Sequence, residues 1–382
     1  MIKKAVVVAL SGGVDSTVAA WLLAKKRKED IESGLEPEGS VFLAGAMHYI
    51  WQGSRCCDAE MILKARALCE KLDIPFFLID MTGEFRTEVV DDFVETYIAG
   101  KTPNPCVRCN QRVRFSGFYD KVKQELAREP LPGSGAALPP ETPLYLATGH
   151  YVNKREKEGR IILCKGNDPS KDQSYMLYQL PETVLPFVLF PLGGYTKQEV
   201  IAIAGDAGLL DGTVVRESQD ACFVEGDYAG FIRDYTDRED LSLPGDIVDT
   251  SGNLLGRHRG YLEYTVGQRK GLSLGTGPWY VADIQPETNR IIVAREEEIR
   301  TLVFKIGETR WFAPADFFSR GPAVKSCTVK IRYRSGDIPC TVEPLGGDCA
   351  RVVLSEPAIV TPGQSAVFYL DSCMLGVGII IP

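Results

Sequence analysis

The sequence predicts an α/β fold followed by all-β segments: an N-terminal doubly wound parallel sheet, a small central β domain and a C-terminal β-barrel. In about the first two hundred residues, β-prone apolar runs alternate with amphipathic runs of helical length, which is typical of a parallel sheet covered by helices. After about Tyr228 the apolar runs become short and are separated by turn residues such as Ser251-Gly252-Asn253. The last runs follow one another at regular spacing, which favours a closed barrel. We therefore expect three domains, at residues 1–225, 226–301 and 302–382.

The composition is that of an ordinary folded protein, with 45% hydrophobic and 25% charged residues in 382. Because there is no run of eighteen apolar residues and no signal-peptide pattern at the N-terminus, we expect a cytoplasmic protein without a membrane span. The net charge of -8 argues against a protein that coats nucleic acid through bulk positive charge, so any RNA contact would use local patches. In a reducing compartment, the 11 cysteines are core residues, metal ligands or reactive groups.

The chain begins with a predicted buried strand at Ala5 to Leu10 and a helix from Thr17 to Lys26, joined by a glycine-rich turn. Further strands are expected at 41–47, 75–81 and 144–148, and helices at about 58–72, 84–99 and 111–128. Strands alternating with helices place ligands at the carboxyl ends of the strands.

The turn Ser11-Gly12-Gly13-Val14-Asp15-Ser16 therefore lies at a helix N-terminus, where free amides and the helix dipole favour an anion. It is neither a Walker A loop nor a G-x-G-x-x-G loop. It resembles the pyrophosphate-binding S-G-G-x-D-S loop of the N-type ATP pyrophosphatases, whose sheet is of the adenine nucleotide alpha hydrolase type. This resemblance implies ATP cleavage between the α and β phosphates, with Asp15 holding Mg²⁺.

A C-x-x-C pair lies in the segment Lys101 to Asn110, which also contains Pro103 and Pro105. Because of the two prolines we expect an irregular, exposed or cleft-lining loop here. Three interpretations of the C-x-x-C pair stay open: half of a zinc site, a redox pair, or one catalytic thiol with an incidental neighbour. Cys222 follows a polar stretch from Arg216 to Asp220, which suits a partly exposed, reactive thiol better than a core one.

Strings spread over most of the chain resemble the tRNA-specific 2-thiouridylases, which replace the carbon-2 oxygen of the wobble uridine with sulfur. They are T-P-N-P-C-V-R-C-N at 102–110, A-T-G-H-Y at 147–151, K-D-Q-S-Y at 171–175, E-S-Q-D-A-C-F at 217–223 and Y-T-V-G-Q-R-K-G-L at 264–272. The resemblance implies an enzyme, a tRNA-uridine 2-sulfurtransferase that uses ATP to adenylate the carbon-2 oxygen and releases AMP and pyrophosphate. It also implies, as partners, the anticodon arm of glutamate, glutamine or lysine tRNA and a persulfide donor protein.

The same resemblance implies the site residues. Cys222 would carry the persulfide, and Cys109 would be the second catalytic thiol, either as an acid or base or as a thiol that attacks the persulfide and leaves a Cys109–Cys222 disulfide. The residues implied to contact ATP are Ala9, Leu10, Ser11, Gly12, Gly13, Val14, Asp15, Ser16, Met47 and Gly149. Those implied to contact tRNA or its target base are Asn104, Pro105, Cys106, His150, Lys171, Asp172, Gln173, Arg332, Tyr333 and Gln364.

Cysteines in the predicted C-terminal strands are interpreted as core residues: Cys327, Cys340, Cys349 and Cys373. Other functions stay open from the residues alone. One is an amide-forming ligase of the same superfamily. Another is a thiolase in which Cys106, Cys109 and Cys222 hold an iron–sulfur cluster. The third is a non-catalytic RNA-binding protein that has kept the nucleotide fold.

Overall fold

The computed structural model describes residues 2–51, 59–132, 136–210, 221–224, 226–312 and 325–381. The chain divides into two compact units. The first unit comprises Met1–Val89 and Cys106–Phe223. The second comprises Val90–Pro105 and Val224–Pro382. No helix in the described ranges is long and apolar enough to cross a membrane.

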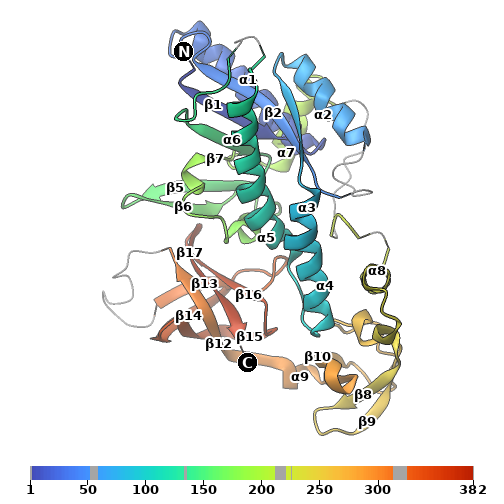
Figure 1. Cartoon of the computed structure of the whole chain (residues 1–382). Helices are drawn as coiled ribbons and strands as arrows, with labels where there is room; N and C mark the ends of the chain where they lie inside the picture. The colour runs from blue at the N-terminus through green and yellow to red at the C-terminus, as the bar shows by residue number, and fades with distance from the viewer. Residues whose placement is uncertain are drawn as a thin grey trace. The chain divides into compact units, whose positions relative to one another are not determined.

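The first unit is built on a five-stranded sheet in the order β3-β2-β1-β4-β7, in which every neighbouring pair is parallel (Figure 1). Its strands are β1 (Lys4–Ala9), β2 (Val41–Tyr49), β3 (Phe76–Asp80), β4 (Leu144–Thr148) and β7 (Val188–Leu189). After Lys4, the central strand β1 is wholly apolar and buried, as expected of a parallel strand that is covered on both faces. The prediction of a doubly wound parallel sheet is confirmed.

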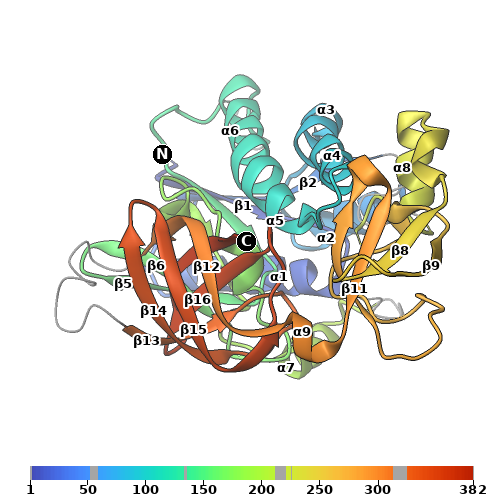
Figure 2. The same cartoon turned by 90° about the horizontal axis from the view of Figure 1, so that it is seen from below.

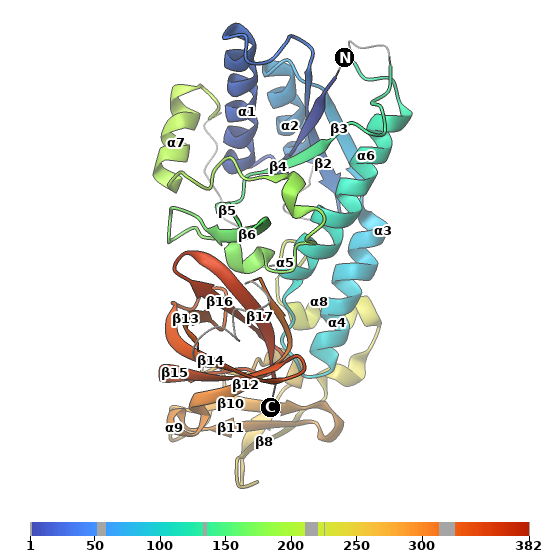
Figure 3. The same cartoon turned by 90° about the vertical axis from the view of Figure 1, so that its left-hand side faces the viewer.

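Helices pack on both faces of this sheet, with α1, α2 and α7 on one side of the strands and α6 on the other (Figure 3). They are α1 (Val14–Glu32), α2 (Ala59–Lys71), α6 (Phe118–Arg128) and α7 (Lys197–Asp206). Val18 of α1, Leu68 of α2 and Val200 of α7 share one buried cluster with Val8 of β1. On the opposite face, the ring of Phe118 lies 5.4 Å from the ring of His48 at the end of β2.

The predicted irregular loop around the C-x-x-C pair is wrong from Pro105 onward. A helix, α5 (Pro105–Arg108), begins at Pro105 and continues into a π-helix, η2 (Cys109–Gly117), and then into α6. Proline is tolerated in the first turn of a helix because its missing N–H would have no intrahelical acceptor there. Cys106 and Cys109 are therefore held on a helix, and η2 is one of the wide turns that are common at functional sites.

Shorter elements complete the first unit. They are α3 (Thr82–Phe85), the π-helix η1 (Arg86–Val90), whose last residue already belongs to the second unit, the hairpin β5 (Val152–Lys157) and β6 (Arg160–Lys165), and the 3₁₀ turns η3 (Ser174–Leu177) and η4 (Leu185–Phe187). The chain from β4 through the hairpin to α7 supplies the loops that lie beside the start of α1.

The second unit contains a four-stranded sheet in the order β10-β11-β8-β9. The strands are β8 (Gly245–Asp249), β9 (Leu254–His258), β10 (Tyr280–Gln285) and β11 (Arg290–Ala294). Helices α4 (Asp91–Ile98), α8 (Tyr228–Thr236) and α9 (Glu296–Ile299) and the 3₁₀ turns η5 (Glu239–Ser242), η6 (Tyr261–Glu263) and η7 (Pro286–Thr288) belong to the same unit. The hydroxyl of Tyr261 donates to the carbonyl of Ile98 at 3.1 Å, which ties α4 to this region.

The rest of the second unit is a closed barrel (Figure 2, orange to red). Its strands are β12 (Arg300–Trp311), β13 (Lys325–Lys330), β14 (Ile338–Gly346), β15 (Cys349–Ile359), β16 (Ser365–Leu370) and β17 (Cys373–Ile381). Because β12 pairs with both β15 and β17, the barrel has no open edge, and the predicted C-terminal barrel is confirmed. Cys327 and Cys340 are buried in its core as predicted. Cys349 is half-buried instead, because it stands at the first position of β15.

Candidate functional site

The glycine-rich turn after β1 forms a closed loop at the N-terminus of α1. The hydroxyl of Ser16 donates to the carbonyl of Gly13 at 3.0 Å and accepts from the backbone N–H of Ser11 at 3.1 Å. Gly13 is the N-cap residue, and it provides no side-chain acceptor for the first amides of α1. A helix N-terminus without a side-chain cap is a ready-made site for a phosphate group.

Glycine is required inside this loop for steric reasons. Gly12 has φ +72°, a conformation that side chains rarely adopt, and a Cβ there would lie 2.7 Å from Sδ of Met61. Gly149 directly follows β4, and a Cβ there would lie 2.7 Å from the backbone nitrogen of Ser16. The turn after β4 therefore packs directly on the backbone of the phosphate loop.

Other residues predicted to contact ATP lie at the same edge of the sheet. Ala9 is the last residue of β1, and Leu10 is buried next to it. Met47 lies two residues before the end of β2, and its side chain is fully buried in the cluster that also holds Leu10. The side chain of Met47 is therefore part of the core of the first unit.

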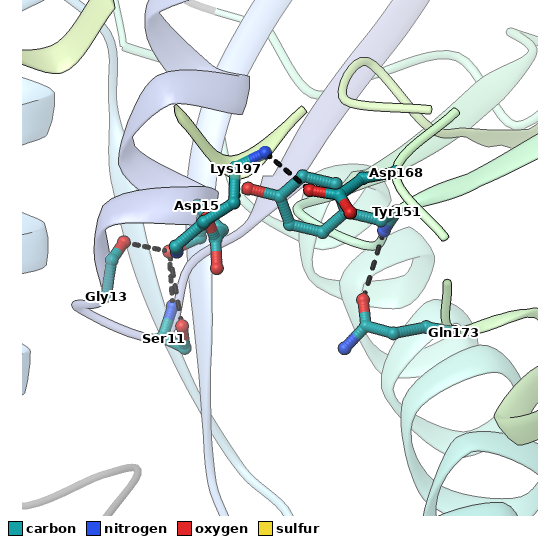
Figure 4. A network of polar contacts seen from close by, with 8 residues as sticks. Ser11, Gly13, Asp15, Tyr151, Asp168, Gln173 and Lys197 are labelled. Atoms are coloured by element: carbon teal, nitrogen blue, oxygen red, sulfur yellow. Dashed lines mark hydrogen bonds and ion pairs between the residues drawn. The ribbon is translucent and has the colours of Figure 1, made fainter. Parts of the chain in front are cut away.

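The carboxylate of Asp15 is the centre of a polar network (Figure 4). The hydroxyl of Tyr151 donates to Oδ1 of Asp15 at 2.7 Å, and Nζ of Lys197 lies 2.6 Å from the same oxygen. Lys197 is the first residue of α7. Neither Tyr151 nor Lys197 was predicted from the sequence as a site residue. The capping pattern from Thr196 to Glu199 could have located the helix start, but nothing local connects Lys197 with Asp15.

Further hydrogen bonds fix the two loops that carry these partners. Asp168 accepts from the backbone N–H of Lys197 at 2.9 Å, and this bond is the main reason that the pKa of Asp168 is lowered. Gln173 accepts from the backbone N–H of Tyr151 at 3.0 Å. Figure 4 marks the bond between Lys197 and Asp168 and the bond between Tyr151 and Gln173 as dashed lines.

Three neighbouring residues predicted to contact tRNA have different surroundings. Asp172 is only 5% exposed, and its carboxylate accepts from Gly166 N–H at 3.2 Å and from the Ser174 hydroxyl at 3.0 Å. Its side chain therefore holds a turn. Gln173 uses its amide oxygen on Tyr151, whereas Lys171 is half-buried.

The two predicted catalytic thiols belong to the same unit as the phosphate loop. Cys109, the first residue of η2, and Cys222 are both half-buried and reduced, and Cys106 is exposed. Phe223, which follows Cys222, is buried, and its ring lies 5.5 Å from the ring of Phe85. This aromatic packing anchors the chain directly after the thiol. Of the motif around Cys222, residues 217–220 lie outside the described residues.

One turn of η2 beyond Cys109, Arg114 organises a partly buried polar cluster. Its Nη1 donates to Oδ1 of Asn110 at 2.9 Å and faces Nε2 of His150 at 3.4 Å. Nδ1 of His150 lies 2.8 Å from the hydroxyl of Thr148. Burial, and then the charge of Arg114, lower the pKa of His150 to about 3, so its imidazole is neutral at neutral pH. Nε2 is then the acceptor, and Nδ1–H donates to Thr148.

In the second unit, segments predicted to contact tRNA come together at one end of the barrel. Arg332 follows β13, and its Nη2 donates to the hydroxyl of Thr361 at 2.6 Å in the loop after β15. Gln364, in that same loop, donates to the carbonyl of Thr102 at 2.7 Å. Asn104 lies two residues farther along the chain, and Tyr333 lies next to Arg332. A Cβ at Gly267 would lie 2.6 Å from Nη2 of Arg332, so the 264–272 string contacts the same end.

Family models match consecutive parts of the chain. The tRNA methyl transferase HUP domain matches residues 4–226, the tRNA methyl transferase PRC-barrel domain matches 230–295, and the aminomethyltransferase beta-barrel domain matches 303–380.

Full-length relatives are also found. The chain is 39% identical to a tRNA-specific 2-thiouridylase MnmA of Geobacter metallireducens, over 98% of this chain and 96% of that protein. It is 39% identical to a tRNA-specific 2-thiouridylase MnmA of Acidithiobacillus ferrooxidans, over 99% of this chain and 98% of that protein. Among solved structures it is similar to the U34-tRNA thiolase NcsA of Methanococcus maripaludis with its [4Fe-4S] cluster. That match has 18% identity and a TM-score of 0.34, and it covers 62% of this chain and 66% of that one.

Proposed function

Because the chain belongs to the tRNA-specific 2-thiouridylase family, we propose that its first unit carries both half-reactions of uridine thiolation, on the residues described above. The protein is an ATP-binding enzyme, a tRNA-uridine 2-sulfurtransferase, and the amide-forming ligase and iron–sulfur alternatives are not favoured. The observation that carries the residue assignment is that the phosphate loop, Cys109 and Cys222 share one compact unit.

The first half-reaction is adenylation. The carbon-2 carbonyl of uridine is a poor electrophile with a poor leaving group, and transfer of AMP to its oxygen makes that oxygen a leaving phosphate. We assign the binding of ATP to the loop from Ala9 to Ser16, with the backbone of Met47 and Gly149 completing the nucleotide site. The uncapped amides of α1 would hold the phosphates that leave as pyrophosphate.

Magnesium fits this site through a single protein carboxylate. No cluster of three or more potential metal ligands occurs in the described part of the chain, but Mg²⁺ is usually held by one or two carboxylates together with substrate phosphates. Asp15 lies at the loop and supplies such a carboxylate. Bound there with ATP, the cation would neutralise charge on the phosphates.

The second half-reaction is sulfur transfer. Cys222 would carry a persulfide, whose terminal sulfur forms a bond to carbon 2 while the bond between carbon 2 and the adenylated oxygen breaks and AMP leaves. The sulfur–sulfur bond to Cys222 must break as well. Cys109 would either move protons, in which case a thiol of the reductant attacks the sulfur of Cys222 and releases the thiolated uridine, or attack the persulfide itself, in which case the terminal sulfur is released as hydrosulfide to attack carbon 2 and a Cys109–Cys222 disulfide forms. A reductant must then restore both thiols. A persulfide donor protein would reload Cys222.

The tRNA would be bound by both units. We assign contacts with the anticodon arm of glutamate, glutamine or lysine tRNA to residues of each unit. In the first unit they are Cys106, His150, Lys171, Asp172 and Gln173, and in the second they are Asn104, Pro105, Arg332, Tyr333 and Gln364. Neutral His150 can accept a hydrogen bond but adds no charge. The division into a catalytic domain at 1–225, a central domain at 226–301 and a tRNA-contacting barrel at 302–382, and a cytoplasmic location, are parts of the same proposal.

The test is an anaerobic reaction containing the protein, ATP, Mg²⁺, a persulfide source and an unmodified transcript of a glutamate or lysine tRNA. Nucleoside mass spectrometry should detect 2-thiouridine, and both Cys222→Ser and Cys109→Ser should abolish it. Cys349→Ser is the matched control, since Cys349 is also half-buried but lies in the barrel. Retained thiolation in Cys222→Ser would overturn the assignment of the sulfur carrier.

A single turnover of enzyme that already carries the persulfide distinguishes the two possible roles of Cys109. Non-reducing peptide mass spectrometry after the reaction should find a Cys109–Cys222 disulfide if Cys109 attacks the persulfide, and none if it only moves protons.

A further inference from the structure

The phosphate loop contains no positive charge of its own. From Ala5 to Ala24, across β1, the loop and the first half of α1, the sequence contains neither lysine nor arginine. A Walker A loop, in contrast, carries a lysine that reaches the outer phosphates. Here the amides and the helix dipole alone would meet a highly charged triphosphate. A cation must therefore come from elsewhere in the fold if these phosphates are to be neutralised by protein as well as by metal.

Lys197 is placed to be that cation. Its Nζ lies 2.6 Å from Oδ1 of Asp15, and its side chain is 12% exposed whereas that of Asp15 is 35% exposed. Nζ also lies 6.0 Å from the centre of the Tyr151 ring. The ammonium group is thus held inside the unit, directly beside the loop, and the more exposed partner is the carboxylate that a metal would take.

The backbone of Lys197 is fixed while its side chain is long and flexible. The Thr196–Glu199 capping box starts α7, and the N–H of Lys197 donates to Asp168 at 2.9 Å. These bonds leave four rotatable side-chain bonds through which Nζ can move by a few ångströms. Such an arrangement allows the ammonium to change partner without any movement of the helix.

We propose that Lys197 is an ATP-phosphate-binding residue: it pairs with Asp15 in the nucleotide-free enzyme and contacts the pyrophosphate part of ATP when Asp15 is taken by the metal. This inference rests on the proposed ATP reaction. In a purely structural role, the ion pair would only fasten α7 to α1. The proposed role instead raises the affinity for ligands that contain a pyrophosphate group and leaves contacts with the adenosine and the α phosphate unchanged.

The test measures equilibrium binding by titration calorimetry, with Mg²⁺ present, of ATP, inorganic pyrophosphate and AMP to the full chain. In Lys197→Met the affinity for ATP and pyrophosphate should fall about 10- to 100-fold, the effect of losing one charge-assisted hydrogen bond, while the affinity for AMP stays nearly unchanged. Lys197→Arg should retain much of the affinity for pyrophosphate. Lys71→Met is the matched control, because Nζ of Lys71 donates to the carbonyl of Gly208 just beyond the other end of α7.

The outcomes separate the inference from the proposed function. If the wild-type chain binds neither ATP nor pyrophosphate, both fail. If it binds both ligands and Lys197→Met binds them equally well, or loses AMP in the same proportion, only the inference fails. If Lys197→Met does not fold, the same affinities are measured with Lys197→Gln, whose side chain can still donate a hydrogen bond to Asp15 but has no charge. Wild-type affinity for pyrophosphate in that variant would overturn the inference.

Discussion

Gly149→Ala tests whether the turn after β4 positions the phosphate loop. The added Cβ would lie 2.7 Å from the backbone nitrogen of Ser16, 2.8 Å from the carbonyl carbon of Asp15 and 3.1 Å from Cβ of Asp15. Two of these atoms are backbone, so rotation of a side chain cannot relieve the contact. Ordinary van der Waals contact begins at 3.4 Å, so the turn and the loop must separate by about 0.7 Å.

This displacement has two measurable consequences. Overpacking of this kind lowers the free energy of unfolding by about 1–3 kcal/mol. The shift would also stretch the 2.7 Å bond between Tyr151 and Asp15, and we expect ATP to bind about 10- to 100-fold more weakly. Urea unfolding followed by circular dichroism gives the first quantity, and calorimetric titration with ATP gives the second.

Gly194→Ala is the control, because a Cβ at Gly194 meets no atom within 4 Å and the residue lies in the loop before α7. We expect it to resemble the wild type in both measurements. The reasoning is refuted if Gly149→Ala unfolds and binds ATP as Gly194→Ala does, since the turn would then yield to the methyl group without disturbing the loop.

Two further predictions concern buried polar groups near η2. Burial lowers the pKa of His48 from its ordinary 6.5 to about 3, so below pH 6.5 the unfolded chain binds a proton that the native chain does not. The free energy of unfolding therefore falls by about 1.4 kcal/mol per pH unit as the pH falls from 6.5 toward 3. In His48→Leu, the free energy of unfolding measured with urea should depend less steeply on pH between pH 7 and 5. An unchanged slope would contradict this. The side chain of Asn110 donates from Nδ2 to the carbonyl of Met176 at 3.1 Å and accepts from Arg114 at Oδ1. Asn110→Ala removes both hydrogen bonds, which should lower the unfolding free energy by about 1–3 kcal/mol in the same assay. Wild-type stability of that variant would show that water replaces both bonds.

The phosphate loop could be predicted from sequence because every determinant is local. An apolar strand, two adjacent glycines and an amphipathic helix follow one another within about thirty residues, and each has a strong conformational preference. The strand Leu144–Thr148 was predicted at its observed bounds for the same reason, since Pro143 and Gly149 flank a short, largely apolar run.

Local preference was misleading or silent elsewhere. The two prolines near the C-x-x-C pair indicate a loop until Pro105 is recognised as a first-turn residue. The hairpin of β5 and β6 was not predicted, because β5 is rich in charged residues and its turn at Glu158 and Gly159 lacks the usual Asn-Gly signature although both residues have positive φ. The wide turn of η2 has no sequence pattern that distinguishes it from α-helix.

Lys197 and Asp15 stand 182 positions apart, and this separation has a consequence for the newly made protein. At the usual speed of translation, about 5–20 residues per second, the loop leaves the ribosome roughly 10–40 s before the lysine that pairs with it. During that interval a nascent chain has the strand, the glycines and the start of α1, but the Asp15 carboxylate lacks its ammonium partner. The nucleotide site that we propose is therefore completed late in synthesis, and a prematurely terminated chain that ends before α7 would have the most recognisable motif of the enzyme without the proposed lysine.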